Sequence, residues 1–600
     1  MKKKITLAVV LACTSVAVFA ETNNEEDPDA VVVTATRTAQ TAFESLASVT
    51  VITREDIEDA QAQEVSDLLS MYPGLDVKQT GGAGTQTSIF LRGTESDHAL
   101  VLVDGVRAFS ATTGAFAWGS IPLSQIERIE IVRGPRASLY GSDAIGGVIQ
   151  IFTRKNNGAS AAVEGGTYGT KGAQAGWGYS SETSHLSFHV SSRETEGFSA
   201  QNENGGSFDP DKDGFNNDSI TIHAGLSLPS RQKIELRTWR AQSETDYDIG
   251  SSEGLNQASS IVLKGNLTGV WFHSLTFGQS TDDYDSQGQS TFGPYAFRYI
   301  TRRNTVDWQH DLSLGTKHLI TAGANYLSEN SKNLDPLTNT IQYDESVVNT
   351  AGFLSILSNI IGTDIQLSGR IDDHEVYGKH STGQIALGRK LLPSTRLWVS
   401  YGSAFRAPDS NDLFFPFGGN LDLKPEESVT TEIGLKLKPS REQSVELNLF
   451  HTRIEELISY NFVTSKSENI EEVSIRGIEA VYTVNTKHWQ ARSSITAKTS
   501  QNDTDKSDLL NRPDQKVSIN IDRHLGTSTV GTEILLVSEA ADYGGGRLHG
   551  YGLASLRYAY SISKDLKLGA KAINITDKEY ETVGGYNTPG RSYYLTLRYR

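Results

Sequence analysis

From about residue 158 to the last residue, apolar and polar side chains alternate along the chain. The alternation is clear at 186–190, 445–449 and 593–599, where every second residue is apolar. A period of two predicts β-strands that have one apolar face and one polar face. About 445 residues follow position 155, and at roughly 20 residues per strand and turn they predict about 22 strands.

Two kinds of architecture fit this alternation. In a transmembrane β-barrel the apolar face contacts lipid and the polar face lines a wet lumen. A soluble β-sandwich or β-solenoid alternates in the same way, but we find no short fixed repeat that would support a solenoid. No segment after the N-terminus reaches the ~20 apolar residues of a membrane helix. We therefore predict a mainly β protein with an antiparallel transmembrane β-barrel of 22 strands.

Residues 38–154 do not show this sustained alternation and predict one compact α+β unit. A short amphipathic helix is predicted at 63–70, and it ends at Pro73-Gly74 because proline cannot continue a helix. Glycine-rich turns separate the predicted strands. These strands are 88–91, 99–103, 126–132 and 147–153.

The first 20 residues predict a signal peptide. Three lysines are followed by a short apolar run and by small residues that end at Ala20, the predicted cleavage point. A lipoprotein-type cleavage before Cys13 is the alternative, although the short apolar run and the bulky Leu11 favour Ala20. Cys13 is the only cysteine, so the mature chain would have neither a disulfide nor thiol chemistry.

The charge of the chain argues against a nucleic-acid partner. The formal net charge is -17, and removal of the three N-terminal lysines takes it to -20. A nucleic-acid-binding surface would be basic.

Residues 31–36 form a β-prone run that follows the acidic, polar stretch 21–29. The run is too short to build a core, but it is long enough to add one strand to the edge of another protein's sheet. A first strand of the local domain is the alternative interpretation.

Asp209, Asp211 and Asp213 precede Gly214 with the Asp-x-Asp-x-Asp-Gly spacing of a calcium loop. Alternate carboxylates on a tightly turned backbone converge on one hard cation. An EF-hand would need a glutamate where Ile220 stands, so we predict a calcium loop outside an EF-hand, with a solvated acidic loop as the alternative.

No motif indicates catalysis. The histidines lack the spacing of a zinc site, and His98 is interpreted as a loop residue of the compact unit. Six charged residues of that unit are interpreted as ion pairs to the barrel. These residues are Arg92, Arg107, Arg133, Arg136, Asp104 and Asp143.

Segments of both halves carry a resemblance to a known family. Residues 88–93, 101–107 and 132–149 resemble the plug domain of TonB-dependent outer-membrane receptors, and 401–408 and 577–591 resemble barrel segments of that family. Residues 577–591 are most similar to its cobalamin-transporting members. The resemblance implies a bacterial outer-membrane protein, surrounded by lipid and lipopolysaccharide, that transports actively and is not an enzyme.

The resemblance also implies how the chain is divided. A signal peptide (1–20) is followed by a periplasmic leader (21–37), a plug (38–154) and a barrel (155–600). The β-prone run matches the TonB box, which pairs as a strand with TonB, the protein driven by the ExbB/ExbD system. The residues of this box are Asp29, Ala30, Val31, Val32, Val33, Thr34, Ala35 and Thr36.

Ligand and metal positions are likewise implied only by the resemblance. Cobalamin contacts are expected from plug and barrel loops at Gln86, Ser88, Glu95, Thr113, Gly114, Ile249 and Tyr543. Calcium, which orders the extracellular loops in cobalamin transporters, is expected at Asp209, Asp211, Asp213, Tyr247 and Asp248. Ser199 and Asn256 stand where the family has aspartates, with Asp246 as a candidate substitute, so weaker binding or fewer ions are expected.

Two other functions compete with cobalamin transport. Residues 108–119 are unexpectedly aromatic, which keeps an iron–siderophore or haem receptor open as an alternative. A secreted β-rich adhesin or carbohydrate hydrolase is the alternative from a different class of protein.

Overall fold

The computed structural model describes residues 31–290, 293–461 and 463–600. The predicted signal peptide and most of the predicted leader, including Asp29 and Ala30, lie outside the described residues. Among the described residues, no helix has both the length and the apolar content needed to cross a membrane.

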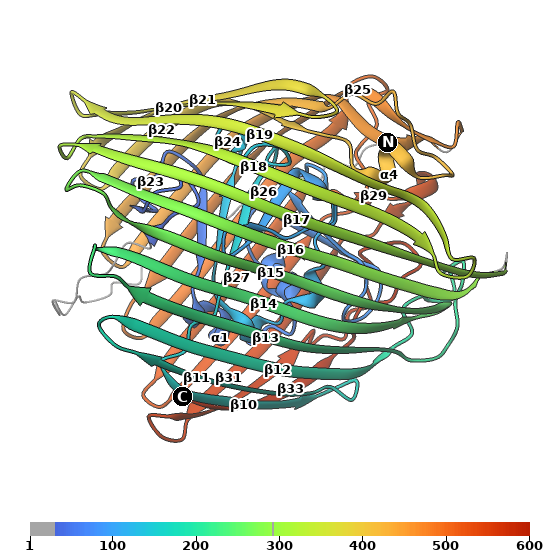
Figure 1. Ribbon diagram of the computed structural model, residues 1–600. Helices are drawn as coiled ribbons and strands as arrows, with labels where there is room; N and C mark the ends of the chain where they lie inside the picture. The colour runs from blue at the N-terminus through green and yellow to red at the C-terminus, as the bar shows by residue number, and fades with distance from the viewer. Residues whose placement is uncertain (1–30, 291–292, 462) are drawn as a thin grey trace.

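Within the described part of the chain, 22 antiparallel strands close into one barrel in chain order, and the last strand pairs back to the first (Figure 1). This confirms the predicted fold class. The first eleven strands are β10 (Gly158–Gly166), β11 (Lys171–Ser180), β12 (Ser184–Phe198), β13 (Asp213–Ser227), β14 (Gln232–Tyr247), β15 (Gly250–Asn266), β16 (Trp271–Ser290), β17 (Gly293–Leu314), β18 (His318–Asp335), β19 (Thr340–Ile360) and β20 (Thr363–His374). The other eleven are β21 (Gly378–Leu392), β22 (Thr395–Arg406), β23 (Glu426–Ser440), β24 (Gln443–Asn461), β25 (Lys466–Asn485), β26 (Trp489–Asn502), β27 (Gln515–Leu525), β28 (Ser528–Val537), β31 (Tyr551–Ser561), β32 (Leu566–Ile573) and β33 (Ser592–Tyr599).

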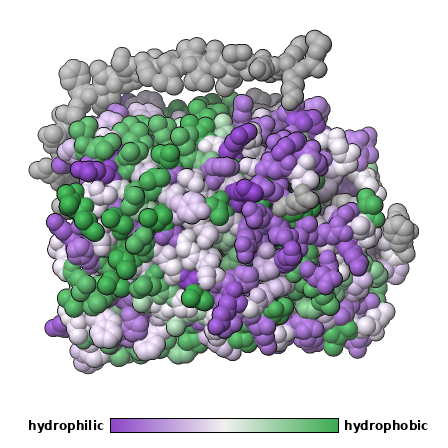
Figure 2. Space-filling view, turned by 90° about the horizontal axis from the view of Figure 1, so that it is seen from above, coloured by the Kyte–Doolittle hydropathy of each residue, from purple (hydrophilic) through white to green (hydrophobic). Residues whose placement is uncertain are grey.

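The alternation of the sequence places apolar side chains on the outer wall. On β33, Tyr593, Leu595 and Leu597 are exposed, whereas Tyr594 between them is buried toward the lumen. Figure 2 shows hydrophobic residues gathered over the left part of one outer face and hydrophilic residues over the right part. The wall is therefore amphipathic in the sense that a bilayer requires.

The two ends of the barrel differ. One end has short turns and carries the C-terminus, at the left of Figure 1; we call it the turn end. The other end has longer connections, including 199–212, 407–425, 503–514 and 574–591; we call it the loop end. Four short elements lie in these longer connections: α4 (Ser410–Phe414), β29 (Ala540–Ala541), η4 (Tyr543–Gly545) and β30 (Arg547–Leu548).

The N-terminal unit, which we call the plug, lies inside the barrel (blue in Figure 1). Its five-stranded sheet has the order β3-β8-β9-β6-β7, and β4 and β5 form a separate hairpin. Its strands are β3 (Val49–Ile52), β4 (Leu75–Gln79), β5 (Thr87–Leu91), β6 (Ala99–Val103), β7 (Val106–Arg107), β8 (Ile126–Arg133) and β9 (Gly147–Thr153). Its helices are α1 (Arg54–Ala60), α2 (Val65–Ser70), η1 (Ser96–His98), η2 (Trp118–Ser120), η3 (Leu123–Gln125) and α3 (Ala137–Tyr140).

The four predicted plug strands are confirmed, and the helix predicted at 63–70 is α2. Helix α1 has no counterpart in the prediction. It begins after Thr53, whose hydroxyl accepts a hydrogen bond from Asp56 N at 3.1 Å while the Asp56 carboxylate accepts one from Thr53 N at 2.8 Å. This reciprocal cap starts a helix that is too short to show apolar periodicity. Ile57 of α1 joins Leu69 of α2 and Ile149 of β9 in the plug core.

Candidate functional site

The predicted ligand residues lie on plug and barrel loops toward the loop end. Gln86 and Thr113 are exposed, and Ser88, Glu95 and Gly114 are half-buried. From the barrel, Ile249 lies in the β14–β15 turn and Tyr543 lies in η4.

Two of the expected ligand residues, Tyr543 of the barrel and Glu95 of the plug, contact the other domain. The ammonium of Lys78 lies 4.7 Å from the ring centre of Tyr543, which joins the β4–β5 hairpin to a barrel loop. The Glu95 carboxylate lies 2.6 Å from the Arg512 guanidinium, and this attraction outweighs burial and holds the pKa of Glu95 below its usual range. Glu95 is therefore engaged by the barrel.

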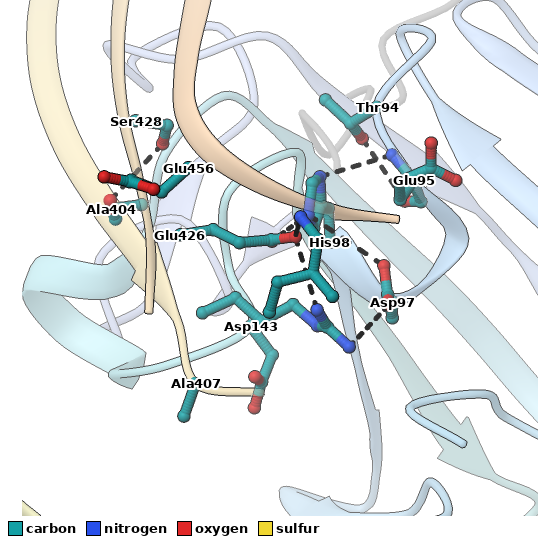
Figure 3. A network of polar contacts seen from close by, with 12 residues as sticks. Thr94, Glu95, Asp97, His98, Asp143, Ala404, Ala407, Glu426, Ser428 and Glu456 are labelled. Atoms are coloured by element: carbon teal, nitrogen blue, oxygen red, sulfur yellow. Dashed lines mark hydrogen bonds and ion pairs between the residues drawn. The ribbon is translucent and has the colours of Figure 1, made fainter. Parts of the chain in front are cut away.

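A buried polar network connects the plug to the barrel next to Glu95 (Figure 3). His98 is fully buried, and its Nε2 lies 2.5 Å from the Glu426 carboxylate at the start of β23. Its Nδ1 accepts a hydrogen bond from Glu95 N at 3.2 Å, so the ring proton is on Nε2 and is donated to Glu426. His98 is thus part of the contact between the domains rather than of a free loop.

Arg406 of β22 extends this network to a second plug carboxylate. Its guanidinium lies 2.7 Å from Asp97 and 3.4 Å from Glu426. Burial raises the pKa of Asp97 to about 6, against the opposing effect of Arg406. Next to Asp97, Gly114 has a φ of +65° and packs against the aspartate β-carbon, so this turn accommodates only glycine without displacement.

Deeper in the lumen, Arg92 bridges two barrel glutamates. Its guanidinium pairs with Glu432 of β23 and, at 2.8 Å, with Glu479 of β25. The three side chains are 4%, 2% and 1% exposed, and Arg92 also lies 4.4 Å from the ring centre of Phe450. We call Arg92, Glu432 and Glu479 the central ion cluster.

The other charged residues predicted to pair with the barrel divide into two groups. Arg133 lies 3.8 Å from Glu479, and Arg136 donates to the Gln384 side chain at 2.8 Å, so both reach the barrel. For the rest, the predicted partner is corrected. Arg107 pairs with Asp143 at 2.8 Å inside the plug, and Asp104 accepts hydrogen bonds from Thr153 of β9. These pairs fix the plug's own loops.

The predicted calcium residues gather at the loop end, but two of their carboxylates, those of Asp213 and Asp248, are already hydrogen-bonded. Asp248 accepts from Gln201 N at 2.8 Å and Asp209 N at 3.1 Å, and Asp213 accepts from Ala200 N at 2.5 Å. Among the described residues, no three His, Cys, Asp or Glu side chains are close enough to hold a metal ion.

The surroundings of this loop nevertheless favour a cation. Asp211 is exposed, and slight burial together with repulsion from Asp209, Asp248 and Asp246 raises its pKa. The Tyr247 hydroxyl bonds to Ser286 at 2.6 Å, so Tyr247 is expected to offer its backbone carbonyl to an ion. The negative charge of these residues thus favours a bound cation. The described residues do not form a complete set of metal ligands.

The β-prone segment is docked on the plug where the structure describes it. Val31–Val32 form a two-residue strand, β1, which pairs with β2 (Gln40–Thr41), and the Val32 side chain is 0% exposed. The Glu130 carboxylate of β8 accepts hydrogen bonds from Val33 N at 3.0 Å and Thr34 N at 2.9 Å. The described part of the segment is thus a short strand on the plug, as in the alternative interpretation of this run. A buried carboxylate binds the backbone donors that an added strand would use.

Sequence reasoning missed the barrel partners of the plug. Glu426, Glu432 and Glu479 are lumen-facing residues of β23 and β25, and Glu130 lies in a plug strand. The signal was present as an acidic residue between apolar neighbours, as in Ile-Glu-Ala at 478–480. Sequence alone does not say which arginine each acid meets.

A sealed transmembrane barrel with a charged interface to an internal plug is the architecture of an outer-membrane transporter. Two family models match the chain. The model described as "TonB dependent receptor-like, beta-barrel" covers residues 155–575, and the TonB-dependent receptor plug domain covers residues 41–148. The chain belongs to the family of TonB-dependent receptors and is therefore an outer-membrane transporter that interacts with TonB.

Known relatives extend this picture. The chain is 29% identical over 631 residues to the vitamin B12 transporter BtuB of Photobacterium profundum, and the match covers 100% of both chains. The ferric enterobactin receptor PfeA of Pseudomonas aeruginosa superposes with a TM-score of 0.80 at 18% identity, covering 95% of this chain and 100% of that one. The copper transporter OprC gives a TM-score of 0.79 at 16% identity, covering 92% and 97%. These structural likenesses show the fold alone.

Proposed function

We propose that this receptor binds cobalamin at its loop end, which faces the cell exterior, and imports it with energy delivered by TonB. The observation that carries the proposal is the full-length similarity to a vitamin B12 transporter. The expected ligand residues are short polar groups together with Tyr543, which suit a large flat ligand with amide arms. An iron–siderophore or haem remains the alternative ligand class, favoured by the aromatic plug segment 108–119.

Cyanocobalamin is expected to bind the purified receptor at a single saturable site. Gln86→Ala and Tyr543→Ala should each weaken binding at least about fivefold, since contacts central to an interface contribute more than about 1 kcal/mol. Tyr179→Ala, which removes an exposed tyrosine from the outer wall of β11, is the matched control and should leave affinity unchanged. Isothermal titration measures all three. Binding of ferric enterobactin or haem without any binding of cyanocobalamin would refute the ligand assignment.

We propose that TonB pairs with residues 29–36 and that the ExbB/ExbD system of the inner membrane energises it. The docked segment supports this role, because its backbone donors are held by one carboxylate that a competing strand edge can displace. Lipid and lipopolysaccharide are the proposed surroundings of the apolar outer wall.

We further propose that calcium orders the loop containing Asp209, Asp211 and Asp213, with Tyr247 and Asp248 contributed by the neighbouring turn. The mutual repulsion at Asp211 is what a cation would relieve. Because two carboxylates must exchange backbone partners for the ion, we expect weaker binding than in a preformed site.

Calcium is expected to tighten cyanocobalamin binding by roughly 5- to 150-fold, the usual range of coupling between two sites. Asp211→Asn should remove most of this effect, since it deletes an exposed carboxylate that the loop does not need for its own hydrogen bonds. Asp422→Asn, in the separate 407–425 loop, is the matched control. Titrations with excess calcium or with a chelator measure the coupling. Equal affinities under both conditions would argue for a solvated acidic loop.

A further inference from the structure

A cavity of about 240 Å³ lies between the plug and one side of the barrel wall. Its lining joins two distant parts of the plug. One is the glycine-rich loop at Gly81 and Gly82 near the loop end, and the other is Asp56, Asp59 and Ala60 of α1 near the turn end. The barrel side is formed mainly by strands β26–β28 and β31–β33, with Arg492 and Lys571 among the lining residues, and also by part of β12 at Arg193 and Thr195. The volume is below the roughly 300 Å³ of the smallest pockets for drug-sized ligands, so a large ligand needs it to widen.

Helix α1 closes this cavity at the turn end through charged contacts to the last barrel strands. The buried Glu58 carboxylate pairs with Arg600 and, at 3.3 Å, with Arg598. Asp59 pairs with Lys567 of β32 at 3.0 Å, and Lys571 Nζ donates to the Ala60 carbonyl at 2.7 Å.

The Glu58 contacts also give the final residue a role. Burial would raise the pKa of Glu58, but its hydrogen bond to Arg600 and the charges of Arg598 and Arg54 hold that pKa far below the usual range. Arg600 therefore binds the plug. Movement of α1 away from the barrel wall breaks this charged contact.

The opposite side of the plug is attached differently. Helix α3 packs against β19–β22. Ser138 of α3 and Ser368 of β20 share a hydrogen bond of 2.8 Å, and Asp143 N donates to the Phe405 carbonyl at 3.1 Å. The cavity and the α3 contact thus lie against different barrel strands.

The order of elements along the chain makes α1 an early target of a pull on residues 31–36. Strand β3 follows the docked segment, lies at the edge of the plug sheet and pairs only with β8, through four residues. Helix α1 begins two residues after β3 ends. Once Val33 and Thr34 leave the Glu130 carboxylate of β8, tension along the chain reaches β3 and then α1 before it pulls on the backbone of β8, β9 or β6. Small peripheral elements open at the lowest free-energy cost.

We propose that α1 is the turn-end gate of a passage along this cavity. Release of α1 from Lys567, Lys571, Arg598 and Arg600 widens the space between the plug and strands β26–β28 and β31–β33, and the ligand passes there while α3 stays attached to β19–β22. This inference rests on the proposed function as a TonB-driven importer, and it adds the side of the barrel on which import occurs.

Two reversible tethers test the passage in the full-length receptor in cells. Gln61→Cys with Gly569→Cys joins the end of α1 to β32, where a β-carbon on Gly569 would lie 3.0 Å from Oε1 at the far end of the Gln61 side chain, and a short cleavable thiol linker bridges the pair if no disulfide forms. Ser138→Cys with Ser368→Cys joins α3 to β20 and is the matched control. The only native cysteine is Cys13, so a disulfide formed by mild oxidation and confirmed by mass spectrometry is the introduced one.

The α1 tether is expected to reduce TonB-dependent cyanocobalamin uptake at least tenfold, the α3 tether less than twofold, and reductant should restore the α1 variant. Binding at the cell surface should be unchanged in both. Equal uptake by the two oxidised variants, whether both import or both are blocked, would overturn the passage. So would a block by the α3 tether alone.

Two controls keep the outcome readable. If the reduced α1 variant fails to import, Asp59→Cys with Lys567→Cys, joined by a short cleavable thiol linker, replaces it. If the unmodified receptor does not import cyanocobalamin, the ligand assignment fails. The same tether comparison is then made with the ferric siderophore or haem that the receptor does import.

Discussion

Val32→Pro is expected to abolish ligand uptake while changing ligand affinity less than about twofold. Proline has no backbone N–H, so it removes a donor from the strand that TonB would pair with. Val32→Ala keeps the N–H and is the matched control, with uptake expected to remain within about threefold of the parent. Uptake of labelled cyanocobalamin in cells, with and without TonB, measures the effect. Parental uptake by Val32→Pro would rule out strand pairing at residues 29–36.

The docked state adds a second control to this experiment. Val32→Pro also disturbs β1, so loss of docking must be separated from loss of pairing. Glu130→Gln weakens the acceptor of Val33 N and Thr34 N but leaves the segment's own backbone intact. It should retain uptake. Because the docked segment cannot pair with TonB, the apparent TonB affinity of the unliganded receptor is lowered by the fraction that is undocked, and Glu130→Gln should raise that affinity.

Arg92→Met is expected to destabilise the plug inside the barrel by about 3–5 kcal/mol, the usual cost of removing one partner from a buried ion pair. The substitution leaves the Glu432 and Glu479 carboxylates buried without their central cation. Urea titration of the purified receptor, followed by a fluorescent label on the plug, measures this free energy separately from unfolding of the barrel.

The matched control replaces the whole central ion cluster. Arg92→Met combined with Glu432→Met and Glu479→Met removes all three charges of the cluster at similar volume, and Arg133, which loses its neighbour Glu479, keeps its hydrogen bonds to the Pro73 carbonyl. The triple variant should therefore recover part of the lost stability. A single Arg92→Met variant that loses less than about 1 kcal/mol would mean that water or Arg133 compensates the two carboxylates, and that the cluster does not hold the plug.

The fold could be predicted because the alternation of apolar and polar residues is visible within each strand segment. Alternation along strands such as 593–599 determines which face contacts lipid, and this can be read from the sequence without knowing any contact between distant residues. Helix α1 was missed because its stability comes from Thr53 capping and from contacts to the barrel rather than from periodicity. The partners of Arg107 and Asp104 were mispredicted for a similar reason. Which partner each residue contacts depends on side chains that are far apart in sequence.

The candidate site was predictable to a lesser degree. Motif spacing points to the Asp209 loop and to residues 29–36, but it cannot show that Asp248 already caps backbone amides or that Glu130 already binds the segment. Both are competing interactions that exist only in the folded chain. They set how readily each segment can exchange its internal partner for an external one.

The contact between Arg600 and Glu58 joins residues 542 positions apart, and β33, which precedes Arg600, is also the strand that closes the barrel against β10. During assembly the plug is made first and the closing strand last. The contact of Glu58 with Arg600 therefore depends both on the register of β33 and on the position of the plug. A barrel that closed with its plug misplaced would leave Arg598 and Arg600 without the Glu58 carboxylate. Closure around a misplaced plug is therefore less favourable than closure around a correctly placed one.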